Sequence, residues 1–325
     1  MILVIDGNNL GHRVFHTPQG QLTTKDGTPS GVMIGILKAI RGMLEKFPET
    51  TRVIVTWDTK GGSQWRKDLY PEYKGNRDYG NDDEEKKKAY QGLWAQMDEV
   101  HNMLHMVGVY SIKLDGYEAD DLMACIASSV TTHSQGKDHV MIVTSDKDML
   151  QLVSDNVSIY TPHKDRVIGP SDFYDVTGVT KEAYIGYRAL VGDKSDYIIG
   201  IEGIGEGKAK KLMDEFGHID NVLNAQGDAK KKLLKSKVMS RIFTPEGLNR
   251  LAINNKIMSF KHIPYSIELE DAVNAVIGVG YEEPPIELAV DSREFKKWLT
   301  KWQFLSILVD YISWIVPFLG LGDDE

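Results

Sequence analysis

The chain has 325 residues, 42% of them hydrophobic, and a formal net charge of −9. This length supports one large domain or two modest domains, each with a real core. The single cysteine, Cys125, excludes a disulfide framework and indicates a reducing compartment. The first segment, MILVID, lacks the basic flank and cleavage site of a secretory signal, so we expect no export.

Short apolar runs rich in β-branched residues alternate with longer amphipathic stretches in the first half of the chain. The runs predict buried strands and the stretches predict helices. Their alternation predicts an α/β fold, with a central, mostly parallel sheet flanked by helices on both faces. The expected strands are Ile2–Ile5, Val53–Trp57, Val109–Ile112, Val140–Val143 and Val157–Tyr160, and the expected helices are Val32–Phe47, Glu84–Val107, Ala119–Val130 and Lys147–Val153.

Helical patterns dominate after about residue 171. We therefore expect an α/β domain over residues 1–170 and a helical subdomain over residues 171–325. The apolar tail, Phe304–Leu319, is shorter than the roughly 20 residues of a membrane span, so we expect a buried terminal helix or a partner contact and no membrane association. The expected helices are Lys181–Leu190, Lys208–Phe216, Ile219–Leu223, Ala229–Ser240, Pro245–Met258 and Arg293–Trp302.

Nine acidic residues fall in five short clusters, most of them at strand ends or helix starts. The carboxyl ends of parallel strands meet at one edge of a sheet, where α/β folds bind ligands. Carboxylates packed together there would repel one another, so the pattern predicts bound divalent metal. Oxygen ligands favour Mg²⁺ or Mn²⁺, and a pair of such ions suits in-line displacement at phosphorus. The nine are Asp6, Asp58, Glu118, Asp120, Asp121, Asp146, Asp148, Asp193 and Asp196.

Some of these acids have an alternative role. One acid of Glu118–Asp121 and one of the pair Asp146 and Asp148 could cap the helix that begins beside it. Without the nine acids the rest of the chain would be close to neutral, so overall acidity does not exclude a phosphodiester substrate.

Two further segments indicate contact with nucleic acid. The polar loop Trp65–Asp83 mixes aromatic and basic residues and offers stacking and phosphate contacts through Tyr70, Tyr73, Lys74 and Arg77. The segment Gly200–Leu212, GIEGIGEGKAKKL, lacks the Walker pattern because Glu202 and Ala209 occupy two of its required positions. It predicts a helix–hairpin–helix that receives a DNA phosphate, with a purely structural glycine turn as the alternative. Its expected contacts are Gly203, Gly205, Gly207, Lys208, Lys210 and Lys211.

Five motifs, in order, resemble the flap endonuclease/5′-nuclease family. They are DGNNLGHR, PEYKGNRD, YEADDL, TSDKDMLQL and GDKSDYIIGIEGIGEGKA, and they extend over roughly residues 1–260. The resemblance implies a PIN-like 5′-nuclease fold with a helix–hairpin–helix (H3TH) element at about 185–225 and a helical arch at about 65–95. Length and the C-terminal third most resemble the ribonuclease H branch of T-even phages, which implies a phage protein acting in the host cytoplasm.

The resemblance also implies roles for individual residues. Asp6, Asp58, Glu118 and Asp120 correspond to one metal position, with Asp121 near it, and Asp146, Asp148, Asp193 and Asp196 correspond to the other. Arg13 and Lys74 match residues that contact the scissile phosphate, Tyr73 lies beside them, and Arg77 and Arg188 are further expected DNA contacts. The expected cofactors are two Mg²⁺, with Mn²⁺ as a substitute, and a monovalent cation at the hairpin.

One motif departs from the family pattern. Bacterial and phage relatives usually have Asp-Asn-Ile-Pro-Gly where this chain has Asp196, Tyr197, Ile198, Ile199 and Gly200, so the turn into the hairpin loses the restraint of proline.

The resulting hypothesis is a monomeric, metal-dependent 5′-3′ exonuclease and flap endonuclease that removes RNA primers. Its expected ligands are DNA and RNA–DNA duplexes with 5′ ends or flaps, together with a sliding clamp or single-strand-binding protein at the apolar tail. Two alternatives stay open at this point, a PIN-type ribonuclease and a non-catalytic structure-specific DNA-binding protein.

Overall fold

Six strands form one sheet in the computed structural model, which describes residues 1–77, 79, 83–278 and 288–321. The strand order is β3-β2-β1-β4-β5-β6; the first five run parallel, and β6 pairs antiparallel with β5. The strands are β1 Ile2–Asp6, β2 Arg52–Trp57, β3 Tyr110–Lys113, β4 Val140–Val143, β5 Val157–Thr161 and β6 Arg166–Ile168. The predicted, mostly parallel sheet is therefore confirmed.

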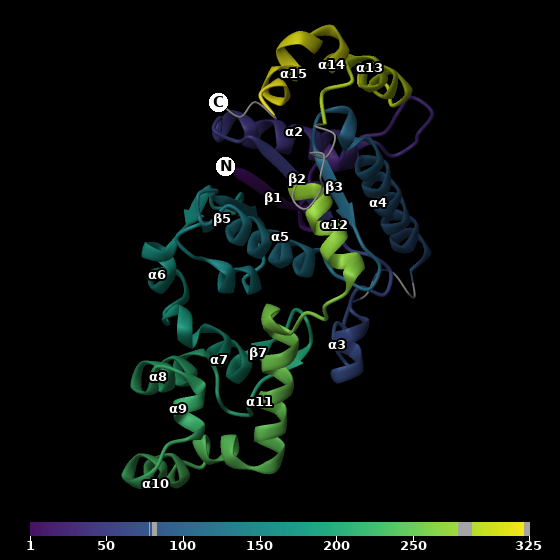
Figure 1. Ribbon diagram of the computed structural model, residues 1–325. Helices are drawn as coiled ribbons and strands as arrows, with labels where there is room; N and C mark the ends of the chain where they lie inside the picture. The colour runs from purple at the N-terminus through teal and green to yellow at the C-terminus, as the bar shows by residue number, and fades with distance from the viewer. Residues whose placement is uncertain (78, 80–82, 279–287, 322–325) are drawn as a thin grey trace.

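Alternate residues of β1, β2, β4 and β5 face two different helical layers. Leu3 and Ile5 pack into the core formed with α2 and α4, whereas Val4 and Ile54 pack into the core formed with α5 and α12. Both faces of the sheet are covered, which is why the strand sequences are apolar almost throughout. Figure 1 shows the two layers on either side of the sheet. The layer helices are α1 Gly7–Phe15, α2 Gly31–Lys46, α4 Glu84–Met103, α5 Ala119–His133 and α12 Ile267–Ile277.

Helix α1 follows β1 without a loop. A Cβ atom on Gly7 would lie 2.7 Å from the ring of Trp57, so only glycine allows the backbone to approach β2 this closely. Asp6 caps the helix by accepting the amide of Asn9 at 2.8 Å. The helix was not expected from the sequence, because Gly7, Asn8 and Asn9 have poor helix propensity.

A second group of helices lies at one end of the sheet (Figure 1). Leu190 and Leu212 belong to the same buried cluster as Val4, so the core continues from the sheet into these helices. The elements of this part are α6 Phe173–Thr177, α7 Lys181–Val191, β7 Gly192–Asp193, β8 Ile198–Ile199, α8 Glu206–Phe216, α9 Ile219–Leu223, α10 Gly227–Lys235 and α11 Pro245–Met258, and α3 Gln64–Leu69 lies beside α11.

The C-terminal helices return to the α/β layer. In Figure 1, α13 Ser292–Lys301, α14 Leu305–Val309 and α15 Tyr311–Leu319 lie over α2 and α4. Phe295, Trp314 and Phe318 are buried in the same core as Leu3 and Ile5. The expected assignment of all residues after 170 to one helical subdomain therefore does not match their packing, because the C-terminal apolar side chains find their partners on α2 and α4.

The apolar tail is only half buried. Ile312, Val316 and Leu319 are 72%, 55% and 54% exposed, whereas Trp314 and Ile315 are buried. None of the helices in the described ranges has the length and apolar content of a transmembrane segment.

Three expected helices are shorter than predicted. The α-helix that begins at Glu84 ends at Met103 and is followed by a 3-10 helix over Leu104–Met106. The stretch Lys147–Val153 forms only a 3-10 helix over Asp148–Leu152, because Asp146 accepts the amide of Asp148 in a tight turn. The stretch Ala229–Ser240 ends as an α-helix at Lys235, where Ser236 adopts an extended conformation, and a 3-10 helix over Met239–Phe243 follows.

Candidate active site

A cleft of about 960 Å³ opens at the carboxyl edge of the sheet. The strand pairing brings the ends of β1, β2 and β4 side by side, and α5 begins beside them. Five of the nine predicted acids line this cleft: Asp6, Asp58, Glu118, Asp120 and Asp146. Residues from four distant parts of the sequence therefore converge, as the strand-end pattern predicted.

Asp6 lines the cleft at the end of β1. One of its oxygens accepts the amide of Asn9, and the other accepts the hydroxyl of Thr144 at 3.0 Å. Burial, followed by the charges of Asp58 and Asp146, raises the pKa of Asp6 from 3.8 to about 7. The carboxylate is thus held in a fixed direction at a place where its negative charge lacks full compensation.

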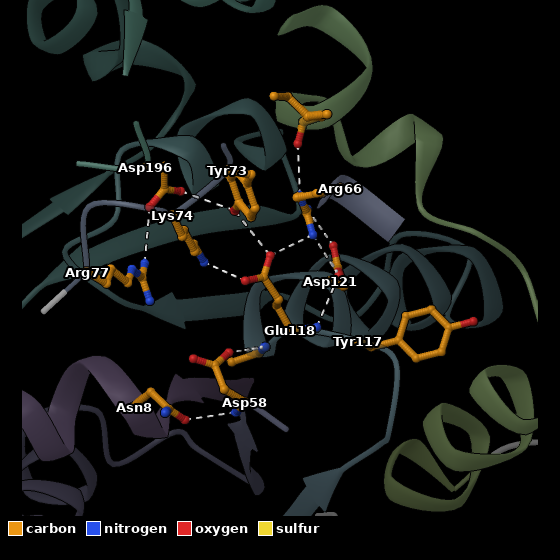
Figure 2. A network of polar contacts seen from close by, with 12 residues as sticks. Asn8, Asp58, Arg66, Tyr73, Lys74, Arg77, Tyr117, Glu118, Asp121 and Asp196 are labelled. Carbon is orange, nitrogen blue, oxygen red and sulfur yellow. Dashed lines mark hydrogen bonds and ion pairs between the residues drawn. The ribbon is translucent and has the colours of Figure 1, made fainter. Parts of the chain in front are cut away.

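Asp58 joins β2 to α5. Its backbone amide donates to the side-chain oxygen of Asn8 at 2.8 Å, and its carboxylate accepts the amide of Ala119 at 2.8 Å (Figure 2). Ala119 is the first residue of α5, so this bond fixes the start of that helix against the end of β2.

Asp120 and Asp146 face the same interior. Burial, and then the charges of Asp146 and Asp6, raise the pKa of Asp120 well above its ordinary value. Burial also raises the pKa of Asp146, with a contribution from the nearby charge of Asp196. These carboxylates repel one another, and a bound cation would relieve that repulsion.

Glu118 lines the cleft and also forms ion pairs with two basic side chains, Lys74 and Arg66. Its carboxylate accepts from Lys74 Nζ at 2.5 Å and from Arg66 Nη1 at 2.8 Å. Burial alone would raise the pKa of Glu118, but the charges of Lys74 and Arg66 outweigh it and lower the pKa.

Asp121 does not line the cleft. It is fully buried, and both of its oxygens accept from the guanidinium of Arg66, at 2.7 and 2.9 Å. It also accepts the backbone amide of Glu118, as the capping alternative predicted. Its inclusion among the metal ligands is therefore corrected, since the buried Arg66 already occupies its oxygens.

The second acidic group forms around Arg188. Its Nη2 atom lies 2.5 Å from an oxygen of Asp148 and 2.5 Å from an oxygen of Asp193. Burial raises the pKa of Asp148 to about 7 although Arg188 opposes this, and the charges of Asp146 and Asp193 add to the rise. Arg188 is buried and engaged with these acids, so its expected role as a DNA contact is corrected.

Asp196 connects this group to the loop after α3. One of its oxygens accepts from Arg77 Nη2 at 3.1 Å and the other accepts the hydroxyl of Tyr73 at 3.2 Å (Figure 2). The backbone amide of Lys74 donates to the Asp196 carbonyl at 2.9 Å. The turn that contains Lys74 is thereby fixed beside the second acidic group.

The donor set suits a hard divalent cation. Carboxylate oxygens are the preferred ligands of Mg²⁺ and Mn²⁺, and the raised pKa values of Asp6, Asp120 and Asp146 indicate uncompensated negative charge. Within the described residues, no three Asp, Glu, His or Cys side chains form a group at metal-ligating spacing. Glu118, Asp148 and Asp193 instead contact Lys74, Arg66 and Arg188, so a cation would compete with these internal partners.

The predicted phosphate contacts divide into two groups. Lys74 and Arg77 line the cleft, whereas Arg13 on α1 is not among its lining residues. Tyr70 and Tyr73 are buried, at 5% and 4% exposure, so their expected role in base stacking is corrected. The hydroxyl of Tyr73 instead donates to Glu118 at 3.1 Å.

An aromatic wall, formed by Tyr79, Tyr90 and Trp94, also lines the cleft. The ring of Tyr79 lies 5.3 Å from that of Tyr90 and 5.4 Å from that of Trp94, in edge-on geometry. Sequence reasoning missed Tyr90 and Trp94, although their i, i+4 spacing on α4 places them on one helix face. The expected arch at about 65–95 contains residues 78 and 80–82, which lie outside the described residues.

The glycine hairpin leads into α8. Gly203 has φ +81°, a conformation that favours glycine, and Gly205 caps the helix. A shallow depression there is lined by Gly203, Gly205, Glu206, Gly207, Lys208 and Lys211. Lys210 does not line this depression. Its ammonium group lies 5.4 Å from the ring centre of Tyr174, so the prediction that Lys210 contacts DNA at the hairpin is wrong.

The stretch that departs from the family motif, after Asp196, contains a residue with positive φ. Tyr197 has φ +59°, a conformation that asparagine tolerates better than tyrosine. Ile199 pairs with Gly192 in the short β7–β8 ladder, and its carbonyl accepts from the Asn254 side chain at 2.9 Å.

Comparison with known families identifies the family of this chain. The family description "5'-3' exonuclease, N-terminal resolvase-like domain" matches residues 1–182, more than half of the chain, and "5'-3' exonuclease, C-terminal SAM fold" matches residues 179–271. The chain belongs to the 5′-3′ exonuclease family. The resemblance predicted from the five motifs is thereby confirmed, and the second match covers the hairpin region, which a PIN-type ribonuclease lacks.

Relatives of this 5′-3′ exonuclease family member include freestanding and fused proteins. It is 30% identical over 280 residues to a 5'-3' exonuclease of Bacillus subtilis (strain 168), covering 84% of this chain and 87% of that protein. It is 31% identical over 241 residues to the thermostable DNA polymerase I of Thermus aquaticus, covering 74% of this chain. The matched region spans 27% of that polymerase.

Solved structures share the fold. The bacteriophage T5 flap endonuclease, in a complex with DNA and metal ions, has a TM-score of 0.66 and 25% identity, covering 86% of this chain and 93% of that one. A zinc-bound T5 5'-exonuclease has a TM-score of 0.69 and 23% identity, covering 85% of this chain and 98% of that one. The α/β fold with a helical C-terminal part is therefore the fold of this family.

Proposed function

We propose that this protein is a metal-dependent 5′-3′ exonuclease and structure-specific flap endonuclease. It hydrolyses phosphodiester bonds at the 5′ ends of RNA–DNA or DNA–DNA duplexes and at flaps, and its biological role is the removal of RNA primers in replication. The observation that carries this proposal is the convergence of five carboxylates in one cleft, three of them with pKa values raised by burial and mutual repulsion.

Asp6, Asp58, Glu118 and Asp120 would hold one Mg²⁺, and Asp146, Asp148, Asp193 and Asp196 a second. When bound, such ions activate the attacking water and stabilise the leaving oxygen. The chain itself fixes the carboxylates: Thr144 and Asn9 orient Asp6, and Ala119 orients Asp58. Mn²⁺ is the proposed substitute, and a monovalent cation is proposed at the hairpin.

Lys74 and Arg77 would bind the scissile phosphate and the adjacent phosphate of the same strand, because both side chains line the cleft together with the acids. The aromatic wall, Tyr79, Tyr90 and Trp94, would stack on bases of the 5′ strand. The glycine hairpin and Lys208 would receive a duplex phosphate at the start of α8, a contact that does not discriminate among base sequences.

The test uses a 5′-labelled flap and an RNA–DNA hybrid, each with Mg²⁺ and with EDTA. We expect cleavage in Mg²⁺ only, and loss of cleavage in Asp146→Asn. Asp155→Asn is the matched control, because Asp155 is exposed and precedes β5 at the opposite edge of the sheet. Equal activity in all conditions, or equal loss in both variants, would contradict the proposal.

We propose that this protein belongs to the ribonuclease H branch of T-even phages and acts in the host cytoplasm. The cleavage rates of an RNA–DNA hybrid and of a DNA duplex test the proposed role in primer removal. Primer removal predicts that the RNA–DNA hybrid is degraded from its 5′ end at a rate comparable to that of the DNA duplex. Resistance of the hybrid would restrict the function to DNA.

A replication partner is proposed for the exposed face of α14 and α15. Val309, Ile312 and Val316 are exposed apolar residues, and a sliding clamp or single-strand-binding protein would cover them. Ile312→Glu should lower partner-stimulated processivity without changing cleavage by the isolated protein. Stimulation that is unchanged in this variant would place the contact elsewhere.

A further inference from the structure

Arg66 lies in the interior between the base of the cleft and the helical part. It belongs to α3 and is only 3% exposed, which is unusual for a charged side chain. Figure 2 shows its guanidinium among residues of α3, α5 and the segment that ends α11. A buried charge of this kind is tolerated only where it is paired and hydrogen-bonded.

The guanidinium contacts three separate groups. Its Nη1 atom donates to Glu118 at 2.8 Å, Nη1 and Nη2 donate to the two oxygens of Asp121, and Nε donates to the carbonyl of Ile257 at 2.9 Å. Ile257 is near the C-terminal end of α11, in the helical part that also contains the hairpin. One side chain therefore joins α3, the first turn of α5 and α11.

The acids held by Arg66 are themselves fixed. Asp121 accepts the amide of Glu118 at 3.1 Å and the indole of Trp65 at 3.3 Å. The oxygen of Glu118 that faces Arg66 also accepts the hydroxyl of Tyr73 at 3.1 Å. The position of the Glu118 carboxylate is thus determined on one side by Arg66 and Tyr73, and on the other by Lys74.

The charges of this network balance. Arg66 and Lys74 are cations, and Glu118 and Asp121 are anions, so the four side chains are neutral together. Asp6, Asp58, Asp120 and Asp146 lie outside this network and keep the negative charge of the cleft. The three acids of the YEADD motif therefore differ in role. Asp121 is paired with Arg66, Glu118 contacts Arg66 and also lines the cleft, and Asp120 lines the cleft outside this network.

We propose that Arg66 is a positioning residue that holds Glu118 and the first turn of α5 in the direction required for cation binding. The proposal rests on the proposed function, because Glu118 belongs to the proposed metal-holding set. Lysine cannot replace arginine here, since its single ammonium group lacks the planar fork that reaches two carboxylates and a carbonyl at once.

The test measures cation affinity separately from cleavage. Arg66→Lys keeps the charge and loses the fork; we expect Mn²⁺ affinity, measured by electron paramagnetic resonance on the protein alone, to fall about 10-fold to 100-fold. The Mg²⁺ concentration for half-maximal cleavage should rise by the same factor, with kcat largely recovered at saturating Mg²⁺.

The matched control is Arg52→Lys. Arg52 donates to the carbonyl of Val276 at 3.1 Å and lies over the ring of Tyr110, but it contacts no acid of the cleft. Its substitution should leave Mn²⁺ affinity unchanged. A fall in affinity of the same size in both variants would overturn the proposal, because a general loss of packing would then explain the effect.

A second variant keeps the test decisive if Arg66→Lys does not fold. Arg66→Gln combined with Asp121→Asn removes one cation and one anion, so the network stays neutral. A folded double variant, verified by its unfolding transition, should still bind Mn²⁺ more weakly than the wild type, and unchanged affinity would refute the role of Arg66. If the wild type binds Mn²⁺ but cleaves no substrate, the proposed function fails while the affinity comparison still decides the role of Arg66.

Discussion

Replacing Asp6 by asparagine should stabilise the metal-free protein at neutral and alkaline pH. The folded protein holds the Asp6 carboxyl where burial and neighbouring acids raise its pKa from 3.8 to about 7. Because the folded state binds the proton more tightly than the unfolded state, the stability of the wild type falls as pH rises from about 4 through 7. Asparagine has no charge to bury, so it removes this loss.

The magnitude follows from the displacement of the pKa. The raised pKa of Asp6 lowers the free energy of unfolding by roughly 4 kcal/mol at pH 8 and by about 1.6 kcal/mol at pH 5, since each pKa unit corresponds to about 1.4 kcal/mol. The stability difference between Asp6→Asn and the wild type should therefore increase by about 2 to 3 kcal/mol from pH 5 to pH 8. The hydrogen bond from Asn9 can remain, because the amide oxygen still accepts it.

Urea denaturation in EDTA at both pH values measures this difference. In saturating Mg²⁺ the order should reverse, because a cation that binds only the folded wild type stabilises it by mass action. Asp155→Asn is again the control, because it removes an exposed carboxylate away from the cleft. A stability difference for Asp6→Asn that is the same at pH 5 and pH 8 would refute the reasoning about charge crowding in the cleft.

Three further predictions concern the cleft, the hairpin and the strained turn. Lys74→Ala should lower kcat by about 100-fold or more while duplex affinity changes little, because Lys74 lines the cleft and contacts Glu118 there. A loss of binding without a loss of rate in single-turnover assays would contradict this. Lys208→Ala should weaken duplex binding for every base sequence and reduce the slope of log affinity against log salt by about 1, and an unchanged slope would exclude a phosphate contact. Tyr197→Asn should raise the free energy of unfolding by about 1 kcal/mol, because asparagine tolerates φ +59°; lower stability in urea denaturation would show that the tyrosine side chain contributes more than the strain costs.

The sequence alone determined the sheet, the edge at which the site lies and the family. Strands such as β1 and β2 are apolar along their whole length because both faces are covered, and this pattern is local and readable. The acids at their ends, Asp6 and Asp58, could be placed together because parallel strands end at the same edge. The five motifs then identified the family that the later comparison confirmed.

Only the tertiary structure decided which acids remain free for a cation. Asp120 and Asp121 are adjacent in the sequence, yet Asp120 lines the cleft whereas Asp121 forms a buried ion pair with Arg66. Likewise Tyr73 is buried, and Tyr90 and Trp94 on α4 supply the aromatic wall instead. The reason is physical: pairing and burial depend on side chains that lie far apart in the sequence, and a local pattern records the chemistry of a residue but not the partner that neutralises it.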